Sequence, residues 1–207
     1  QGLELTVVGK TLESEIDFCE YDFIYAGSGT EKSQKAALKH LLQYRDSLTE
    51  ALSSGIPALF TGNACEMLGT SITDSQGNQY EALGLLDFTT TERSDIRYTG
   101  DAVAESQLFS SPVVGFVNKC SALEGITSPL FRLKMGHGNN PDTRDEGFHY
   151  RNVLGTHLIG PLLVKNPAVM EWLVKLIGSR QEGFVYTPKI YEYEEKSYET
   201  TLRALEE

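Results

Sequence analysis

The chain has 207 residues, a formal net charge of −11, 40% apolar residues and 23% charged residues. This length and composition indicate a globular protein with a well-filled core. The acidic balance argues against a general binder of nucleic acid or anionic membranes, because both need a basic surface.

No apolar run approaches the roughly 20 residues of a membrane span, and the first residues lack the basic-then-apolar pattern of a signal peptide. We therefore expect a cytoplasmic protein. The three cysteines (Cys19, Cys65 and Cys120) are odd in number and widely spaced. This spacing predicts reduced thiols and neither a disulfide framework nor a structural zinc site. No phosphate-binding or dinucleotide-binding glycine motif is present, so no cofactor is expected.

The first third of the chain alternates strands and helices. We expect strands over residues 3–8, 21–26 and 56–61, a long amphipathic helix over 34–52, and a helix directly after residue 61. Short links between such elements are typical of parallel βαβ units, which place their chemistry at the carboxyl ends of the strands. Two turns of small residues, at Gly27 and at Gly62, follow predicted strands.

The rest of the chain has a different pattern. It predicts a hairpin over 70–82, strands over 95–105, 111–118, 131–135, 147–150 and 152–158, a polar loop over 136–142, and a helix over 168–177 that buries Trp172. A terminal helix is expected over 197–205, inside an acidic tail from about 186 to 207. One domain over 1–207 is the simplest organisation.

Residues 56–69, IPALFTGNACEMLG, have the layout of a nucleophile elbow, a tight strand-to-helix turn that holds one side chain at the end of a sheet. The turn position is Gly62, and Cys65 lies three residues beyond it. Gly27-Ser28-Gly29-Thr30 allows positive φ angles and exposes backbone N–H groups, which suits an anion or oxyanion site. A plain strand-to-helix turn is the alternative there.

Several motifs follow in order: E-M-L-G, E-A-L-G-L-L-D-F, R-Y-T-G-D, G-F-V-N, G-H-G-N-N, and E-G-F-H-Y-R-N-V-L-G-T-H-L-I-G-P-L-L-V-K-N-P. They resemble the class I glutamine amidotransferases of the CobB/CobQ type, and among these the GatD subunits of lipid II isoglutaminyl synthase. The resemblance implies a flavodoxin-like α/β fold with a mostly parallel sheet and helices on both faces. It also implies a further strand and helix before residue 3.

Active relatives are expected to hydrolyse glutamine with a Cys–His pair and to pass the ammonia to a Mur-ligase-like partner of the MurT type. When the family motifs are laid on this chain, the nucleophile position falls on Gly62 and the histidine position on Ile159. Both catalytic positions are therefore degenerate. A thiolate and an imidazole are what this chemistry needs, so the resemblance predicts a domain without glutaminase activity.

A relocated pair, Cys65 with His157, is the alternative. Cys65 lies almost one helical turn past the elbow, and His157 lies two residues before the family histidine. The competing interpretation is that Cys65 is a buried helix residue and that His157 is a partly exposed strand residue.

Substrate-binding candidates implied by the resemblance are Arg97, Gly27, Gly29 and Asn63. For Arg97, a surface ion pair is the competing interpretation. Glu66 stands where the family has glutamine, and Lys119 where it has histidine; we expect Glu66 to add negative charge near any bound carboxylate.

Three hypotheses remain open. The leading one is a catalytically inactive, GatD-like subunit that binds or regulates a Mur-ligase-like partner in peptidoglycan metabolism. The second is an active amidotransferase that uses Cys65 and His157. The third is a module that binds glutamine or another small anionic ligand through Arg97 and the turn at residues 27–29.

Overall fold

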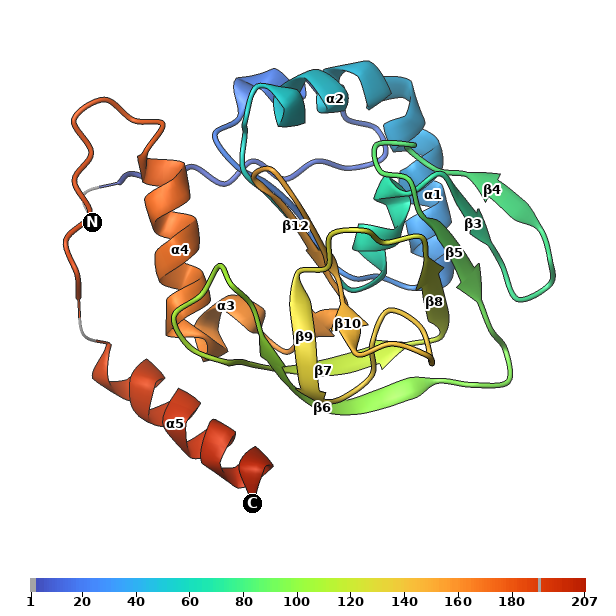
Figure 1. Ribbon diagram of the computed structural model, residues 1–207. Helices are drawn as coiled ribbons and strands as arrows, with labels where there is room; N and C mark the ends of the chain where they lie inside the picture. Colours follow the sequence, from blue (N-terminus) through green and yellow to red (C-terminus); the bar gives the residue numbers. More distant parts are fainter. Residues whose placement is uncertain (1–2, 190) are drawn as a thin grey trace.

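The computed structural model describes residues 3–189 and 191–207, and it has a mixed α/β fold (Figure 1). Its helices are α1 Glu31–Leu41, α2 Arg45–Ser53, α3 Leu162–Lys165, α4 Pro167–Gly178 and α5 Glu192–Glu206, with 3-10 segments η1 Phe18–Glu20, η2 Leu42–Tyr44 and η3 Gly62–Leu68. Its strands are β1 Ile24–Ala26, β2 Ala58–Thr61, β3 Ser71–Thr73, β4 Gln79–Glu81, β5 Thr89–Glu92, β6 Tyr98–Glu105, β7 Val113–Lys119, β8 Ser121–Glu124, β9 Phe131–Met135, β10 Asp145–Glu146, β11 Phe148–Tyr150, β12 Val153–Thr156 and β13 Leu158–Ile159.

The described strands form three sheets, ordered β1-β2-β12-β11, β10-β9-β6-β7-β13 and β4-β3-β5-β8. In the first sheet β2 pairs in parallel with both β1 and β12, as the βαβ pattern predicts. Most of the other pairs are antiparallel, and the one parallel pair outside this sheet joins β3 to β5. Parallel pairing is thus concentrated in the sheet that carries the elbow.

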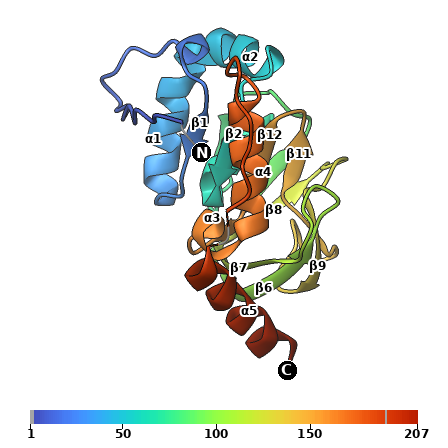
Figure 2. The same cartoon turned by 90° about the vertical axis from the view of Figure 1, so that its left-hand side faces the viewer.

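Helices cover both faces of the first sheet (Figure 2). Side chains of successive strand residues point to opposite faces, and β2 shows this directly. Phe60 belongs to the apolar cluster that contains Leu38 of α1 and Leu48 of α2. Leu59 belongs to the second cluster, with Leu162 of α3 and Val169 of α4.

Two predictions for the first third of the chain are wrong. Residues 3–8 form no strand; Leu5 and Val7 are exposed, and a β-prone sequence needs a neighbouring strand to satisfy its backbone. The long helix is two helices, because the chain tightens into η2 and the backbone of Tyr44 leaves the helical range at φ −114° and ψ 16°. The first of these helices also starts earlier than predicted, at a cap where the Thr30 hydroxyl accepts from the Ser33 amide at 3.0 Å.

The later elements agree better with their predictions. The hairpin appears as β3 and β4, residues 131–135 form β9, and the terminal helix appears as α5, which starts five residues earlier than expected. The sequence did not predict β5, β8 or β10. Trp172 is half-buried rather than buried, at the edge of the second cluster. None of the helices in the described residues has the length and apolar character that a membrane crossing requires.

Candidate functional site

The elbow keeps its sharp backbone turn. Gly62 follows β2 directly and has φ +60°, in the left-handed region that glycine enters at little cost. An L-residue in this region is strained, as the nucleophile of such an elbow is. The predicted helix after the turn is the 3-10 segment η3. The turn therefore has the conformation of an elbow with no side chain on it.

The two small-residue turns meet, as their places at the ends of parallel strands predict. The Asn63 side chain accepts a hydrogen bond from the Gly29 amide at 2.9 Å and donates to the Gly29 carbonyl at 3.1 Å. Gln34 of α1 donates to the Asn63 carbonyl at 2.5 Å. The amide of Gly29 is therefore already bonded within the protein, and neither Gly27 nor Gly29 adopts a positive φ.

Cys65 and His157 come together inside the protein. The Cys65 sulfur lies 3.9 Å from Nε2 of His157, and the two residues are 0% and 1% exposed. His157 was expected to be a partly exposed strand residue; it instead lies between β12 and β13, where the chain passes from the first sheet to the second. Burial raises the pKa of the Cys65 thiol, although His157 opposes the rise.

Glu66 is the stronger partner of His157. The Nε2 group donates to Oε1 of Glu66 at 3.0 Å, and Ser121 of β8 donates to the same oxygen. Gln34 donates to Oε2 at 2.7 Å. Glu66 is 2% exposed, and its carboxylate is enclosed by three donors.

Glu146 of β10 contacts His157 at its backbone amide and on the Nδ1 side of its ring. Its Oε1 accepts from the backbone amide of His157 at 2.7 Å and lies 3.6 Å from Nδ1, while Oε2 accepts from the Thr156 hydroxyl at 2.6 Å. Nδ1 has no hydrogen bond of its own. His157 therefore lies between two buried carboxylates.

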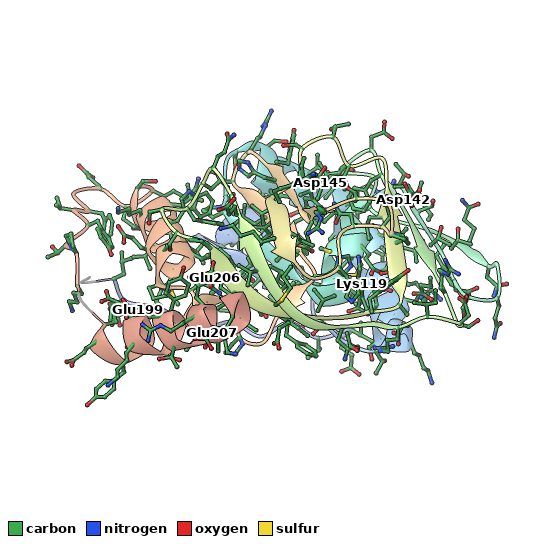
Figure 3. The ribbon with its side chains drawn as sticks, turned by 60° about the horizontal axis from the view of Figure 1, so that its bottom comes forward. Lys119, Asp142, Asp145, Glu199, Glu206 and Glu207 are labelled. Atoms are coloured by element: carbon green, nitrogen blue, oxygen red, sulfur yellow. The ribbon has the colours of Figure 1, made fainter. Side chains whose placement is uncertain are left out.

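Lys119 completes this arrangement. This residue, labelled in Figure 3, ends β7 and is 4% exposed. Its Nζ donates to the carbonyls of Gly138 and Asn139 at 2.6 and 3.0 Å. Glu66, Lys119, Glu146 and His157 form what we term the buried charge quartet, whose formal charges cancel when all four are ionised. Hydrogen bonds of the quartet reach the first sheet at Thr156 of β12 and the third sheet at Ser121 of β8, while Glu146 lies in β10 of the second sheet and Glu66 in η3.

The electrostatics favour the ionised form of two members of the quartet, His157 and Glu66. Burial lowers the pKa of His157 and the charge of Lys119 lowers it too, but Cys65, through its charge and its hydrogen bond, together with Glu146 raises it well above its usual value. Burial opposes ionisation of Glu66 as well, yet the hydrogen bond and charge of His157 lower the pKa of this carboxyl. Burial lowers the pKa of Lys119, and Glu146 counteracts it.

The remaining candidates lie nearer the surface. Ile159 is half-buried in β13, paired across the strands with Phe116 of β7. Arg97 is exposed; its Nε donates to Asn118 at 2.6 Å, and its Nη1 lies 3.4 Å from Glu31 at the start of α1. Arg97 thus makes the surface ion pair that was the alternative to ligand contact.

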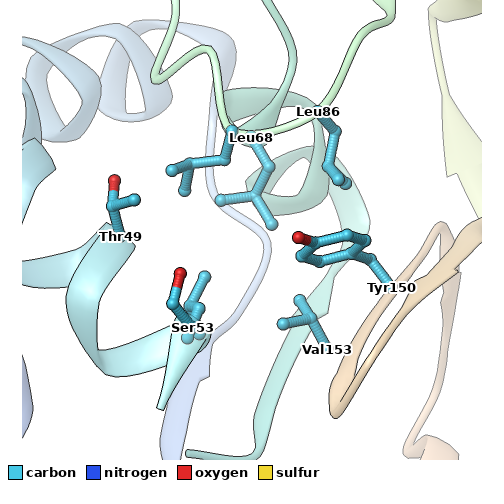
Figure 4. A pocket seen from close by; sticks show the side chains of 8 residues that line it. Thr49, Ser53, Leu68, Leu86, Tyr150 and Val153 are labelled. Atoms are coloured by element: carbon cyan, nitrogen blue, oxygen red, sulfur yellow. The ribbon is translucent and has the colours of Figure 1, made fainter. Parts of the chain in front are cut away.

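Two cavities lie apart from the turn position Gly62. One, of about 50 Å³, is lined by Thr49, Leu52, Ser53, Leu68, Leu85, Leu86, Tyr150 and Val153 (Figure 4). The other, of about 430 Å³, is lined by residues of 105–112 together with Arg132. Gly62, Cys65 and His157 line neither of them. In the described ranges, no group of three or more His, Cys, Asp or Glu is arranged to hold a metal ion.

The comparisons with known proteins bear on the family. Residues 3–167 match the model of the CobB/CobQ-like glutamine amidotransferase domain. The chain belongs to this family. It is 34% identical over 91% of its length to the GatD subunit of lipid II isoglutaminyl synthase from Staphylococcus aureus, of which it covers 76%. The GatD subunit from Streptococcus pneumoniae is 27% identical over 88% of this chain and 71% of that one.

Solved structures support the fold. A glutamine amidotransferase crystal structure has a TM-score of 0.55 at 16% identity, covering 80% of this chain and 86% of that chain. PurLQS from Thermotoga maritima has a TM-score of 0.56 at 14% identity, covering 79% and 82%. The amidotransferase fold predicted from the motifs is confirmed.

Within this family fold, the sequence patterns gave no site role to two of the four quartet members, Lys119 and Glu146. Glu146 lies in a quoted motif but received no role in the site, Lys119 was noted only as standing at a family histidine position, and Gln34 was assigned only to a helix. The sequence does show ionisable residues at the ends of predicted strands and in turns. It does not show that these residues contact one another, because contacting pairs lie up to 91 residues apart along the chain.

Proposed function

We propose that this chain is a GatD-like amidotransferase-fold protein without glutaminase activity, which acts as a cytoplasmic binding or regulatory subunit. Its proposed partner is a Mur-ligase-like protein of the MurT type, and its proposed setting is peptidoglycan synthesis. The similarity to GatD subunits supports the partner, since those proteins are named as subunits of a synthase. We treat residues 1–207 as one domain, because the buried charge quartet ties the sheets together.

The observation that carries the loss of activity is the elbow itself. Gly62 has the φ of +60° that presents a nucleophile, but it has no side chain to present. The aligned histidine position holds Ile159, an aliphatic residue that cannot transfer a proton. We infer that Gly62 and Ile159 are degenerate catalytic positions.

The second candidate function is hydrolysis of glutamine by Cys65 and His157, and their 3.9 Å contact favours it. Three features weigh against it. The thiol is fully buried, burial raises its pKa, and Nε2 of His157 is committed to Glu66. A nucleophilic cysteine needs an accessible thiolate beside a free base.

Binding of glutamine or another small anion is the third candidate. Its proposed groups are Arg97, Gly27, Gly29 and Asn63. The Gly29 amide and the Arg97 guanidinium both have partners within the protein, so an anion would have to displace them.

The partner is tested by co-purification. The full chain, tagged and co-expressed with the Mur-ligase-like protein of its own organism, should elute with it as one complex in size-exclusion chromatography. Separate elution at micromolar concentrations would contradict the proposed subunit role, and this outcome does not depend on whether the chain hydrolyses glutamine.

A further inference from the structure

The space above the elbow is occupied. A Cβ atom built on Gly62 would lie 2.3 Å from Cβ of Ser28 and 3.2 Å from both its Cα and its Oγ. Carbon atoms do not approach within 3 Å in a relaxed structure. Ser28 therefore fills the position that the first side-chain atom of any other residue at the elbow would need.

Ser28 is also held where it is. It lies in the short link between β1 and α1, and both of its flanks are fixed. On one side Ala26 pairs with Phe60 of β2. On the other, the Gly29 backbone is bonded twice by Asn63, and Thr30 caps α1. Asn63 directly follows Gly62, so its two hydrogen bonds to the Gly29 backbone hold the neighbouring Ser28 against the elbow.

We propose that Ser28 and Gly62 are a coupled pair in which the Ser28 side chain plugs the elbow, so that no change at Gly62 alone can restore a nucleophile. This inference rests on the proposed function, in which Gly62 is the vacated nucleophile position. The Ser28–Gly62 pair explains why residue 62 is glycine, because the Ser28 side chain leaves no room for a Cβ atom at this turn. The pair also predicts that the space above Gly62 is filled by the link between β1 and α1, which contains Ser28.

The test is a double-mutant cycle on the full chain with Gly62→Ala and Ser28→Gly, read from urea unfolding. Gly84 supplies a matched control for backbone strain. It has φ +64°, close to the +60° of Gly62, but a Cβ at Gly84 would meet nothing within 4 Å. Gly84→Ala therefore measures the cost of an L-residue in this conformation without a clash.

We expect Gly62→Ala to lower the folding equilibrium constant by roughly ten- to a hundredfold more than Gly84→Ala. In the Ser28→Gly background this excess should disappear. Equal losses at the two glycines, or an excess that persists without the Ser28 side chain, would overturn the proposal. If Gly62→Ala does not fold, recovery of folded protein in the double variant supports the plug, and failure of both contradicts it.

A chemical readout tests the same pair independently of stability. In Gly62→Cys with Ser28→Gly, alkylation by iodoacetamide at residue 62, located by peptide mass spectrometry, should proceed within the folded state. With Ser28 retained, labelling at residue 62 should be at least about tenfold slower or should require unfolding. Equal labelling rates would contradict the plug. Neither urea unfolding nor alkylation at residue 62 depends on glutamine hydrolysis. Glutaminase activity in the unaltered chain would therefore refute the proposed function without changing what these two experiments say about Ser28 and Gly62.

Discussion

Nε2 of His157 lies 3.0 Å from a carboxylate oxygen of Glu66 and 3.9 Å from the sulfur of Cys65. A ring nitrogen that donates its proton to a buried carboxylate has no free lone pair to accept a proton from a thiol. The Nε2 proton of His157 is therefore donated to Glu66, and the histidine acts as a buried cation beside the Cys65 sulfur.

This role makes stability depend on pH in a defined direction. The folded-state pKa of His157 is raised above its unfolded value of 6.5. Its contribution is fully present below pH 6.5 and is lost as the pH rises towards the folded pKa. Between about pH 6.5 and 8, below the range in which cysteine thiols titrate, the free energy of unfolding should fall, with a slope of at most about 1.4 kcal/mol per pH unit.

Urea denaturation at intervals across this pH range measures the slope. The control is His157→Gln, which removes the titrating group and should show a flatter curve at a lower overall stability. A wild-type stability that rises over this range, or the same slope in both proteins, would show that His157 is not a protonated member of the quartet.

Glu66→Gln should be strongly destabilising. The two oxygens of Glu66 receive donors from His157, Ser121 and Gln34, so the amide nitrogen of a glutamine must face a donor. Removing one partner of a buried ion pair leaves the other uncompensated, and we expect a loss of about 3 kcal/mol in the free energy of unfolding.

The control for that substitution is Glu81→Gln. Glu81 pairs with Arg45 at 2.6 Å, but its side chain is 69% exposed, so its loss should be below about 1 kcal/mol. The urea midpoints of Glu66→Gln and Glu81→Gln, each compared with wild type, measure the two losses in stability. Similar small effects at both positions would mean that the quartet contributes no more than a surface pair.

The three thiols should differ in reactivity. Cys19 is exposed, Cys120 is partly exposed with a pKa raised to about 11 by burial and by its hydrogen bond to Glu31, and Cys65 is fully buried. In native protein at neutral pH, Cys19 should react first with iodoacetamide, and Cys65 should react only after unfolding. Peptide mass spectrometry against time gives the order, and labelling of Cys65 ahead of Cys19 would revive the relocated pair.

Arg97→Ala should have little effect. Arg97 makes an exposed ion pair with Glu31 and a hydrogen bond with Asn118, so we expect a change below about 1 kcal/mol in the free energy of unfolding. Thermal shifts with glutamine, glutamate and inorganic phosphate should be absent in both wild type and variant. A glutamine-dependent shift that Arg97→Ala abolishes would favour the ligand-binding hypothesis.

Local patterns carried much of the fold. Amphipathic spacing located the helical region before Gly55, and the apolar run before Gly62 located β2, since both patterns are set by neighbours along the chain. The motifs identified the amidotransferase fold without a structure. Residues 3–8 have an equally clear strand pattern but form none, because a strand also depends on an adjacent strand that the pattern does not reveal.

The site was less predictable than the fold. The positions of the elbow and of the turn at residues 27–30 followed from strand ends, but their contact and the space filled by Ser28 are through-space relations. The same holds for Glu146, whose role beside His157 arises where β10 of one sheet meets the end of β12 of another. Contacts of this kind depend on how the sheets pack, which periodicity and spacing do not specify.

The most direct measurement is glutamine hydrolysis by the full chain, alone and with its co-expressed Mur-ligase-like partner, followed as glutamate release, with Cys65→Ala as the matched variant. The account predicts that wild type and variant release glutamate at the rate of the protein-free control in both settings. Hydrolysis by wild type that Cys65→Ala abolishes would contradict the central claim, because it would show that the buried thiol is the nucleophile.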